Sequence, residues 1–133
     1  MTNDPQAVLD TFHQYAKTFE HLNPAKVLPF YHYPAILISP DKVVAIKNWI
    51  EGFVIFKIVM GGLKRRGYDH SHMESLSVRH LSDELAIVSG GVIRYKKDNT
   101  ELERFGLTYT LRQVDGDWKI VVGALYEPKL LNL

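Results

Sequence analysis

Residues 71–127, SHMESLSVRHLSDELAIVSGGVIRYKKDNTELERFGLTYTLRQVDGDWKIVVGALYE, decide the fold because they hold four strand-like segments in succession. Runs rich in β-branched and aromatic residues, in part alternating polar with apolar, predict strands over four ranges: 71–81, 85–96, 102–114 and 118–127. Short turn sequences separate the segments, and Asp115-Gly116 is a strong hairpin signal. Long strands joined by tight turns pair antiparallel, so this half predicts a four-stranded meander. Gly90-Gly91 indicates a bend that curves the sheet.

The preceding part of the chain begins with a predicted helix that Asp4 caps and Pro5 starts. Its apolar residues recur at helical spacing and form one stripe: Val8, Phe12, Tyr15, Ala16 and Phe19. A short second helix is expected over Pro24–Phe30, and a short hairpin over 35–46.

A third helix is predicted from Asn48 to about Gly67. Asn48 and Glu51 have the spacing of a capping box, and Lys64-Arg65-Arg66 before Gly67 is typical of a helix end. Apolar residues lie on most sides of this helix, so we expect burial on more than one side. The order is therefore three helices and a hairpin, followed by four long strands.

The composition excludes several classes of protein. The chain has 133 residues, which predicts a single domain over 1–133, and no cysteine, which excludes disulfides and thiolate chemistry. Its formal charge of +1 does not suit a strongly basic nucleic-acid-binding protein. The N-terminus lacks the pattern of a signal peptide and no apolar run could span a bilayer, so we expect a cytoplasmic protein without a membrane partner.

The order of elements resembles the NTF2-like superfamily, which includes ketosteroid isomerase and SnoaL-like proteins. The local signals are Tyr15 in the first helix, Gly67-Tyr68-Asp69-His70-Ser71 before the sheet, and the final hairpin from Tyr109 to Ile120. The resemblance implies an α+β, cone-shaped, cystatin-like fold, with three N-terminal helices on a curved antiparallel sheet. Because this superfamily contains enzymes, binding proteins and transport factors, it does not by itself imply an activity.

Comparison with ketosteroid isomerase places Tyr15 at the oxyanion tyrosine, and makes it the one catalytic candidate. The same register places Ser39 where the family has its catalytic base, and Leu107 near its oxyanion aspartate. Ala124 stands where SnoaL-like proteins often have a histidine. The resemblance therefore leaves open whether the protein is an enzyme. The pair His70 and His72 is too small to predict a metal site, and we expect no metal and no cofactor.

We expect the cone to bind a small apolar molecule, because a concave apolar pocket is the default binding site. The predicted walls are the aromatic residues of the helices and sheet: Phe12, Tyr15, Phe19, Trp49, Phe53 and Tyr109. Two alternatives stay open, an enzyme of the SnoaL or ketosteroid isomerase type with a non-standard active site, and a dimeric assembly module without chemistry.

The resemblance also implies a homodimer that forms through the outer face of the sheet. The apolar residues predicted for that face are Val92, Leu107, Leu111 and Val121. Arg94, Glu103 and Arg104 are expected to form cross-strand ion pairs on the same face. The alternative for Arg94 is a buried arginine that recognises an anion.

Overall fold

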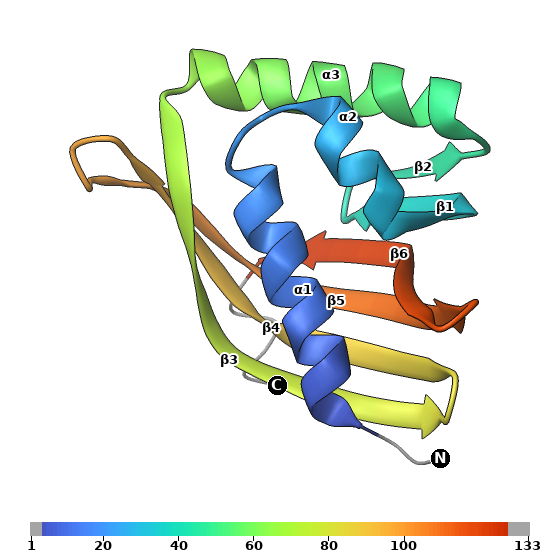
Figure 1. Ribbon diagram of the computed structural model, residues 1–133. Helices are drawn as coiled ribbons and strands as arrows, with labels where there is room; N and C mark the ends of the chain where they lie inside the picture. Colours follow the sequence, from blue (N-terminus) through green and yellow to red (C-terminus); the bar gives the residue numbers. More distant parts are fainter. Residues whose placement is uncertain (1–3, 128–133) are drawn as a thin grey trace.

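The computed structural model describes residues 4–127, in which one curved six-stranded sheet carries the helices on its concave side (Figure 1). The elements follow the predicted order: α1 Pro5–Phe19, α2 Pro24–Val27, the 3-10 helix η1 Leu28–Phe30, β1 Tyr31–Ser39, β2 Lys42–Ile46, α3 Trp49–Arg65, β3 Tyr68–Ser82, β4 Leu85–Lys96, β5 Glu101–Val114 and β6 Asp117–Tyr126. The predicted second helix over Pro24–Phe30 is split after Val27, because Pro29 near its end has no N–H to continue α-helical hydrogen bonding.

The sheet has the strand order β2-β1-β6-β5-β4-β3. Strands β3 to β6 form the predicted antiparallel meander, and β1 pairs antiparallel with β2. The pair β1–β6 is parallel, so the sheet is mixed and not wholly antiparallel. These two strands are far apart in the sequence, and no hairpin turn dictates their direction.

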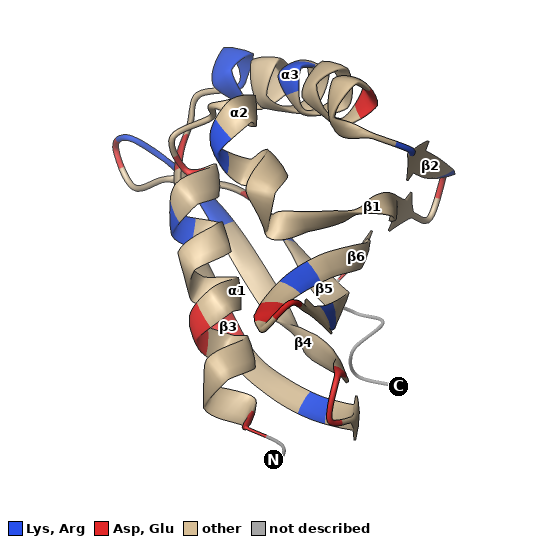
Figure 2. Ribbon diagram, turned by 45° about the vertical axis from the view of Figure 1, so that its right-hand side comes forward, with Lys and Arg blue, Asp and Glu red and all other residues tan. Residues whose placement is uncertain are grey.

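Both long helices begin at the predicted caps. The Asp4 side chain accepts a hydrogen bond from the Gln6 N–H, and the Asn48 side chain accepts one from the Glu51 N–H at 3.0 Å. Helix α1 lies across the concave face, with Val8, Phe12 and Tyr15 buried against the sheet (Figure 1). An acidic residue at the start of α3 and basic residues at its end match the helix dipole (Figure 2).

Helix α3 is buried on one side only. Its buried residues are Gly52, Phe56, Met60 and Leu63, whereas Ile50 is 78% exposed and Ile58 is 68% exposed. The expectation of burial on more than one side is therefore wrong for these residues. Gly52 allows a close approach of α3 to η1, because a Cβ there would lie 2.7 Å from Leu28 Cδ2 and the Leu28 side chain would have to move.

The curvature of the sheet arises where β3 faces Gly90. The register of β3 and β4 shifts between Glu74 and Ser77, and Ser75 has a positive φ of 54°, as in a β-bulge. The bulge brings the Glu74 carbonyl oxygen to 2.8 Å from the position of a Cβ on Gly90. The bend predicted at Gly90 is thus produced by a bulge in the neighbouring strand, which only a glycine accommodates.

The prediction of outer-face residues is wrong for Val92, Leu107 and Leu111, which are buried in the core on the concave side. Residues two apart in a strand share a face, so Leu107 and Leu111 must lie on the same side as Tyr109. Val121, the fourth predicted residue, is the extra residue at a register shift in β6. Ile36 and Ile38 of β1, more than a third exposed, alternate with the inward-facing Leu37.

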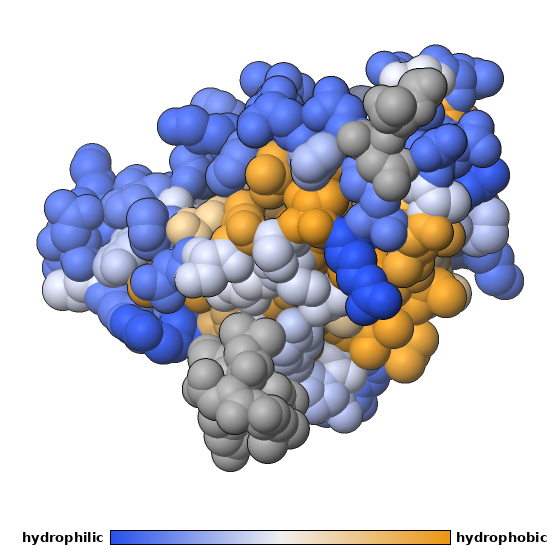
Figure 3. Space-filling view, turned by 90° about the horizontal axis from the view of Figure 1, so that it is seen from below, coloured by the Kyte–Doolittle hydropathy of each residue, from blue (hydrophilic) through white to orange (hydrophobic). Residues whose placement is uncertain are grey.

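The surface is apolar in places. Seen from below, hydrophobic residues gather into a patch bordered by hydrophilic residues (Figure 3).

Within the part of the chain that the structure describes, no helix is both long and apolar enough to cross a membrane.

Candidate functional site: the cavity between the helices and the sheet

Two adjoining hollows lie between α1, α3 and the concave face of the sheet. The larger has a volume of about 190 Å³ and the smaller one of about 40 Å³. They share five wall residues: Tyr15, Phe19, Arg94, Tyr109 and Leu125. We call the larger hollow the cone cavity; its other walls include Leu37, Val44, Ile55, Phe56 and Val59.

Three tyrosines lie together in the wall of the cone cavity. Tyr15 of α1, Tyr31 of β1 and Tyr109 of β5 are all buried, and the hydroxyls of Tyr15 and Tyr31 are 2.7 Å apart, as in a hydrogen bond. The rings of Tyr15 and Tyr109 have centres 6.0 Å apart. We call these three residues the tyrosine cluster.

Burial keeps the tyrosine cluster neutral. It raises the pKa of Tyr15 and of Tyr31 well above the ordinary value of 10.0, and the neighbouring Tyr109 raises both further. Burial also raises the pKa of Tyr109. At neutral pH the cluster can therefore donate hydrogen bonds to a ligand, but it cannot supply a phenolate.

Arg94 points into the cone, so its predicted place on the outer face is wrong. Only 15% of its side chain is exposed, and its guanidinium carbon lies 4.6 Å from the centre of the Phe105 ring. The cross-strand pair with Glu103 is confirmed, with Nη1 donating to Oε2 at 2.7 Å. Arg104 does lie on the outer face, where it pairs with Glu101.

Glu103 is shared between two arginines. Arg66, which caps α3, donates to its other carboxylate oxygen at 2.8 Å. Burial alone would raise the pKa of Glu103, but the hydrogen bonds and charges of Arg66 and Arg94 lower it below its usual value. One carboxylate thus faces two guanidinium groups, and the group carries a net positive charge.

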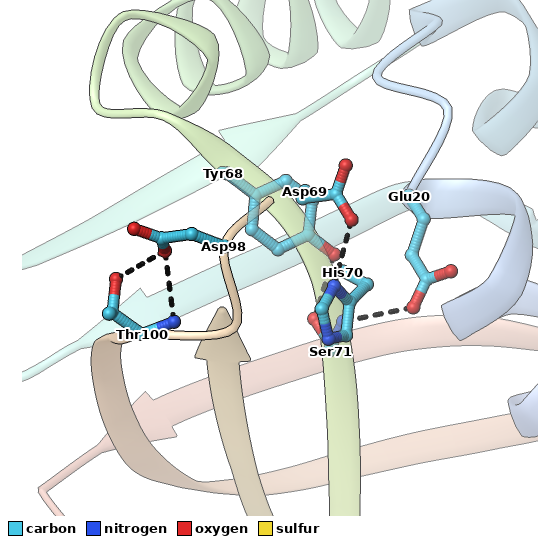
Figure 4. Close-up of polar contacts among 7 residues, drawn as sticks. All are labelled: Glu20, Tyr68, Asp69, His70, Ser71, Asp98 and Thr100. Atoms are coloured by element: carbon cyan, nitrogen blue, oxygen red, sulfur yellow. Dashed lines mark hydrogen bonds and ion pairs between the residues drawn. The ribbon is translucent and has the colours of Figure 1, made fainter. Parts of the chain in front are cut away.

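Hydrogen bonds tie the start of β3 to the end of α1 (Figure 4). The Glu20 carboxylate accepts a hydrogen bond from the Ser71 N–H at 2.9 Å, and the hydroxyls of Ser71 and Tyr68 are 2.7 Å apart. Ser71 also lines the smaller hollow. These contacts hold α1 at a fixed distance from the sheet at this end.

Four of the six predicted pocket residues line the two hollows. Tyr15, Phe19 and Tyr109 line both, and Phe12 lines the smaller one. Trp49 and Phe53 do not, since they are 51% and 41% exposed and do not line either hollow. The reason is the rotation of α3, which turns Ile55, Phe56 and Val59 toward the sheet. A helix that is apolar all round does not reveal in its sequence which side is buried.

Several wall residues were missed by sequence reasoning. Tyr31 was outside the predicted strand, because β1 begins four residues earlier than its apolar run. The alternation of β1 and β2 could have identified Leu37 and Val44 once Ala35 was assigned to the core side.

The positions that matter in ketosteroid isomerase do not form a catalytic set here. The Ser39 hydroxyl donates to Asp41 at 2.6 Å, Asp41 itself is exposed, and Leu107 is an apolar wall of the smaller hollow. Ala124 pairs with Thr108 in the sheet. It stands between Gly123 and Leu125, which line the cone cavity, and neighbouring residues of a strand face opposite sides. Neither hollow has a carboxylate or a histidine among its lining residues, so neither has a general base of that kind.

No group of three or more His, Asp and Glu able to hold a metal ion occurs within residues 4–127. The His70 ring instead bonds to Asp69 at 2.8 Å and stacks on Tyr95, on the side of β3 away from the cavity.

The model of the family "NTF2-like protein (DUF6841)" matches residues 4–128. The chain belongs to this family. No curated protein matches the sequence. The resemblance to the NTF2-like superfamily drawn from the sequence is therefore confirmed.

Solved structures of the same fold are distant in sequence. A protein of unknown function with a cystatin-like fold from Nostoc punctiforme is 11% identical, with a TM-score of 0.76, and the match covers 96% of this chain and 94% of that one. An NTF2-like protein of unknown function from Shewanella oneidensis is 14% identical, with a TM-score of 0.73 and coverage of 92% and 98%. A candidate ketosteroid isomerase from Parabacteroides distasonis is 18% identical, with a TM-score of 0.68 and coverage of 97% and 91%. At these identities the matches establish the fold alone.

Proposed function

We propose that this protein binds a small, mainly apolar molecule in the cone cavity. The observation that supports the proposal is a mainly apolar hollow of about 190 Å³ whose few hydrogen-bonding wall residues are the tyrosine cluster, Ser39, Lys42 and Arg94. Pockets of this kind, apolar with a few placed polar groups, are typical of ligand sites. The lack of a carboxylate or histidine in its walls favours binding over acid–base catalysis.

The size of the cavity limits the ligand. An apolar cavity of about 150 Å³ accepts benzene, so about 190 Å³ suits a molecule of one ring with a short substituent, or two fused rings. Indole is a suitable neutral probe, because its ring is apolar and its N–H can donate to a tyrosine hydroxyl.

The test compares two tryptophan substitutions on β2. Val44 lines the cone cavity, whereas its neighbour Val43 is 67% exposed on the opposite side of the strand. Titration with indole, followed by ¹H–¹⁵N NMR, should shift the amides of the cavity walls in the wild type and in Val43→Trp. In Val44→Trp the shifts should disappear, because the new side chain fills the cavity. Equal binding by both variants, or shifts outside the cavity, would refute the proposal.

A further inference from the structure

The charged residues that line the cone cavity are all basic. Its lining residues include two cations, Arg94 and Lys42, and no Asp or Glu. The smaller hollow is lined by Arg94 as well, again without an acidic residue. Three carboxylates, Asp41, Glu103 and Glu127, line an adjoining groove that shares Arg94 and Leu125 with the cone cavity. A mainly apolar cavity whose own charged lining residues are both basic favours an anion.

Arg94 keeps hydrogen-bonding capacity toward the cavity. A guanidinium has five N–H donors, and the bond to Glu103 is the one hydrogen bond of the Arg94 side chain among the described residues. Glu103 is already shared with Arg66, so its single charge does not neutralise both arginines. The planar guanidinium suits a carboxylate, which it can bind through two parallel N–H groups.

The surroundings hold the guanidinium in place. Its central carbon lies 4.6 Å from the ring centre of Phe105, 5.7 Å from that of Phe19 and 5.8 Å from that of Tyr68. Cations are attracted to aromatic ring faces at such distances, so the three rings favour this position of the guanidinium. An arginine fixed in this way loses little conformational freedom when a ligand binds.

We infer that the ligand of the cone cavity is an apolar carboxylic acid, whose carboxylate binds Arg94 and whose apolar body lies among Leu37, Val44 and Leu125. The inference rests on the proposed function and adds to it the chemical class of the ligand. The tyrosine cluster supplies further donors to the same molecule.

Two probes of matched size test the inference, 3-phenylpropionate and its neutral amide, 3-phenylpropionamide. We expect the acid to bind the wild type at least about tenfold more tightly than the amide, the amount that one charge-assisted hydrogen bond contributes. In Arg94→Gln this preference should disappear. Arg104→Gln is the matched control, since it removes the same charge from the outer face and should keep the preference.

Arg94→Gln should still fold, because Glu103 retains Arg66 as a partner. Arg94→Lys provides a second variant, which keeps the charge but not the two-pronged geometry and should retain part of the preference. Equal binding of acid and amide by the wild type would overturn this inference and leave the proposed function standing. An undiminished preference in Arg94→Gln would also overturn it. If neither probe nor indole shifted any amide of the cavity walls, the proposed function would fail as well.

Discussion

Replacing Tyr15 by Phe removes one hydroxyl from the tyrosine cluster and leaves its partner, the Tyr31 hydroxyl, without its 2.7 Å hydrogen bond. Both residues are about 95% buried, so the remaining Tyr31 hydroxyl can turn only to the neighbouring Tyr109 or to the cone cavity for a new partner. A buried hydroxyl left unpaired costs about 1–3 kcal/mol, which is more than the roughly 1 kcal/mol net value of an average hydrogen bond. We therefore expect Tyr15→Phe to lower the free energy of unfolding by about 1–3 kcal/mol, while the aromatic packing stays intact.

A variant with both tyrosines replaced tests whether the cost comes from the unpaired hydroxyl. Tyr31→Phe alone should cost a similar amount, but Tyr15→Phe/Tyr31→Phe should cost less than the sum, because no unpaired hydroxyl of that pair remains. Urea unfolding at pH 7, followed by circular dichroism, measures all three. Tyr95→Phe is the control, since the Tyr95 ring stacks on His70 away from the cavity, and it should change stability by no more than about 0.5 kcal/mol. Additive costs, or no cost for Tyr15→Phe, would refute the account of the cluster.

The other predictions concern pH, the bulge and assembly. Because burial raises the pKa of Tyr15 above 10.0, its contribution to stability is complete below about pH 10 and is lost as the pH rises further. The wild type should thus lose stability above pH 10 more steeply than Tyr15→Phe, by up to about 1.4 kcal/mol per pH unit, in urea titrations from pH 9 to 11. Gly90→Ala should cost about 1–3 kcal/mol through its 2.8 Å clash with the Glu74 carbonyl, whereas Gly91→Ala, with no atom closer than 3.8 Å, should be nearly neutral in thermal melts. If the outer sheet face forms a homodimer, Ile36→Glu should convert it to monomer in light scattering, and a wild type that is already monomeric would contradict the dimer.

Element types and order could be predicted from the sequence where local signals agree. The caps at Asp4 and Asn48 and the turn at Asp115-Gly116 mark element ends, and the structure has elements that begin or end there. These signals act over a few residues, so they need no knowledge of the tertiary structure. The parallel pairing of β1 with β6 is set by packing between distant segments, so no local sequence pattern predicts it.

The site was predictable only in part, for the same reason. The α1 stripe is amphipathic, so Phe12 and Tyr15 could be assigned to the cavity side with Tyr109 opposite. On α3 both sides are apolar, and Trp49 and Phe53 were assigned to the wrong one. The direction of Arg94 depends on the strand register, since a residue beside the apolar Ile93 can face either side until neighbouring strands are placed.

The most direct test of the central claim is the measurement of intermolecular nuclear Overhauser effects between bound indole and the methyl groups of the protein. Binding in the cone cavity predicts contacts from the indole ring protons to Leu37, Val44 and Leu125, which line it. Contacts to the exposed methyl groups of Ile50 and Ile58 on α3 in their place would show that the apolar surface, and not the cone, binds the molecule, and would contradict the account.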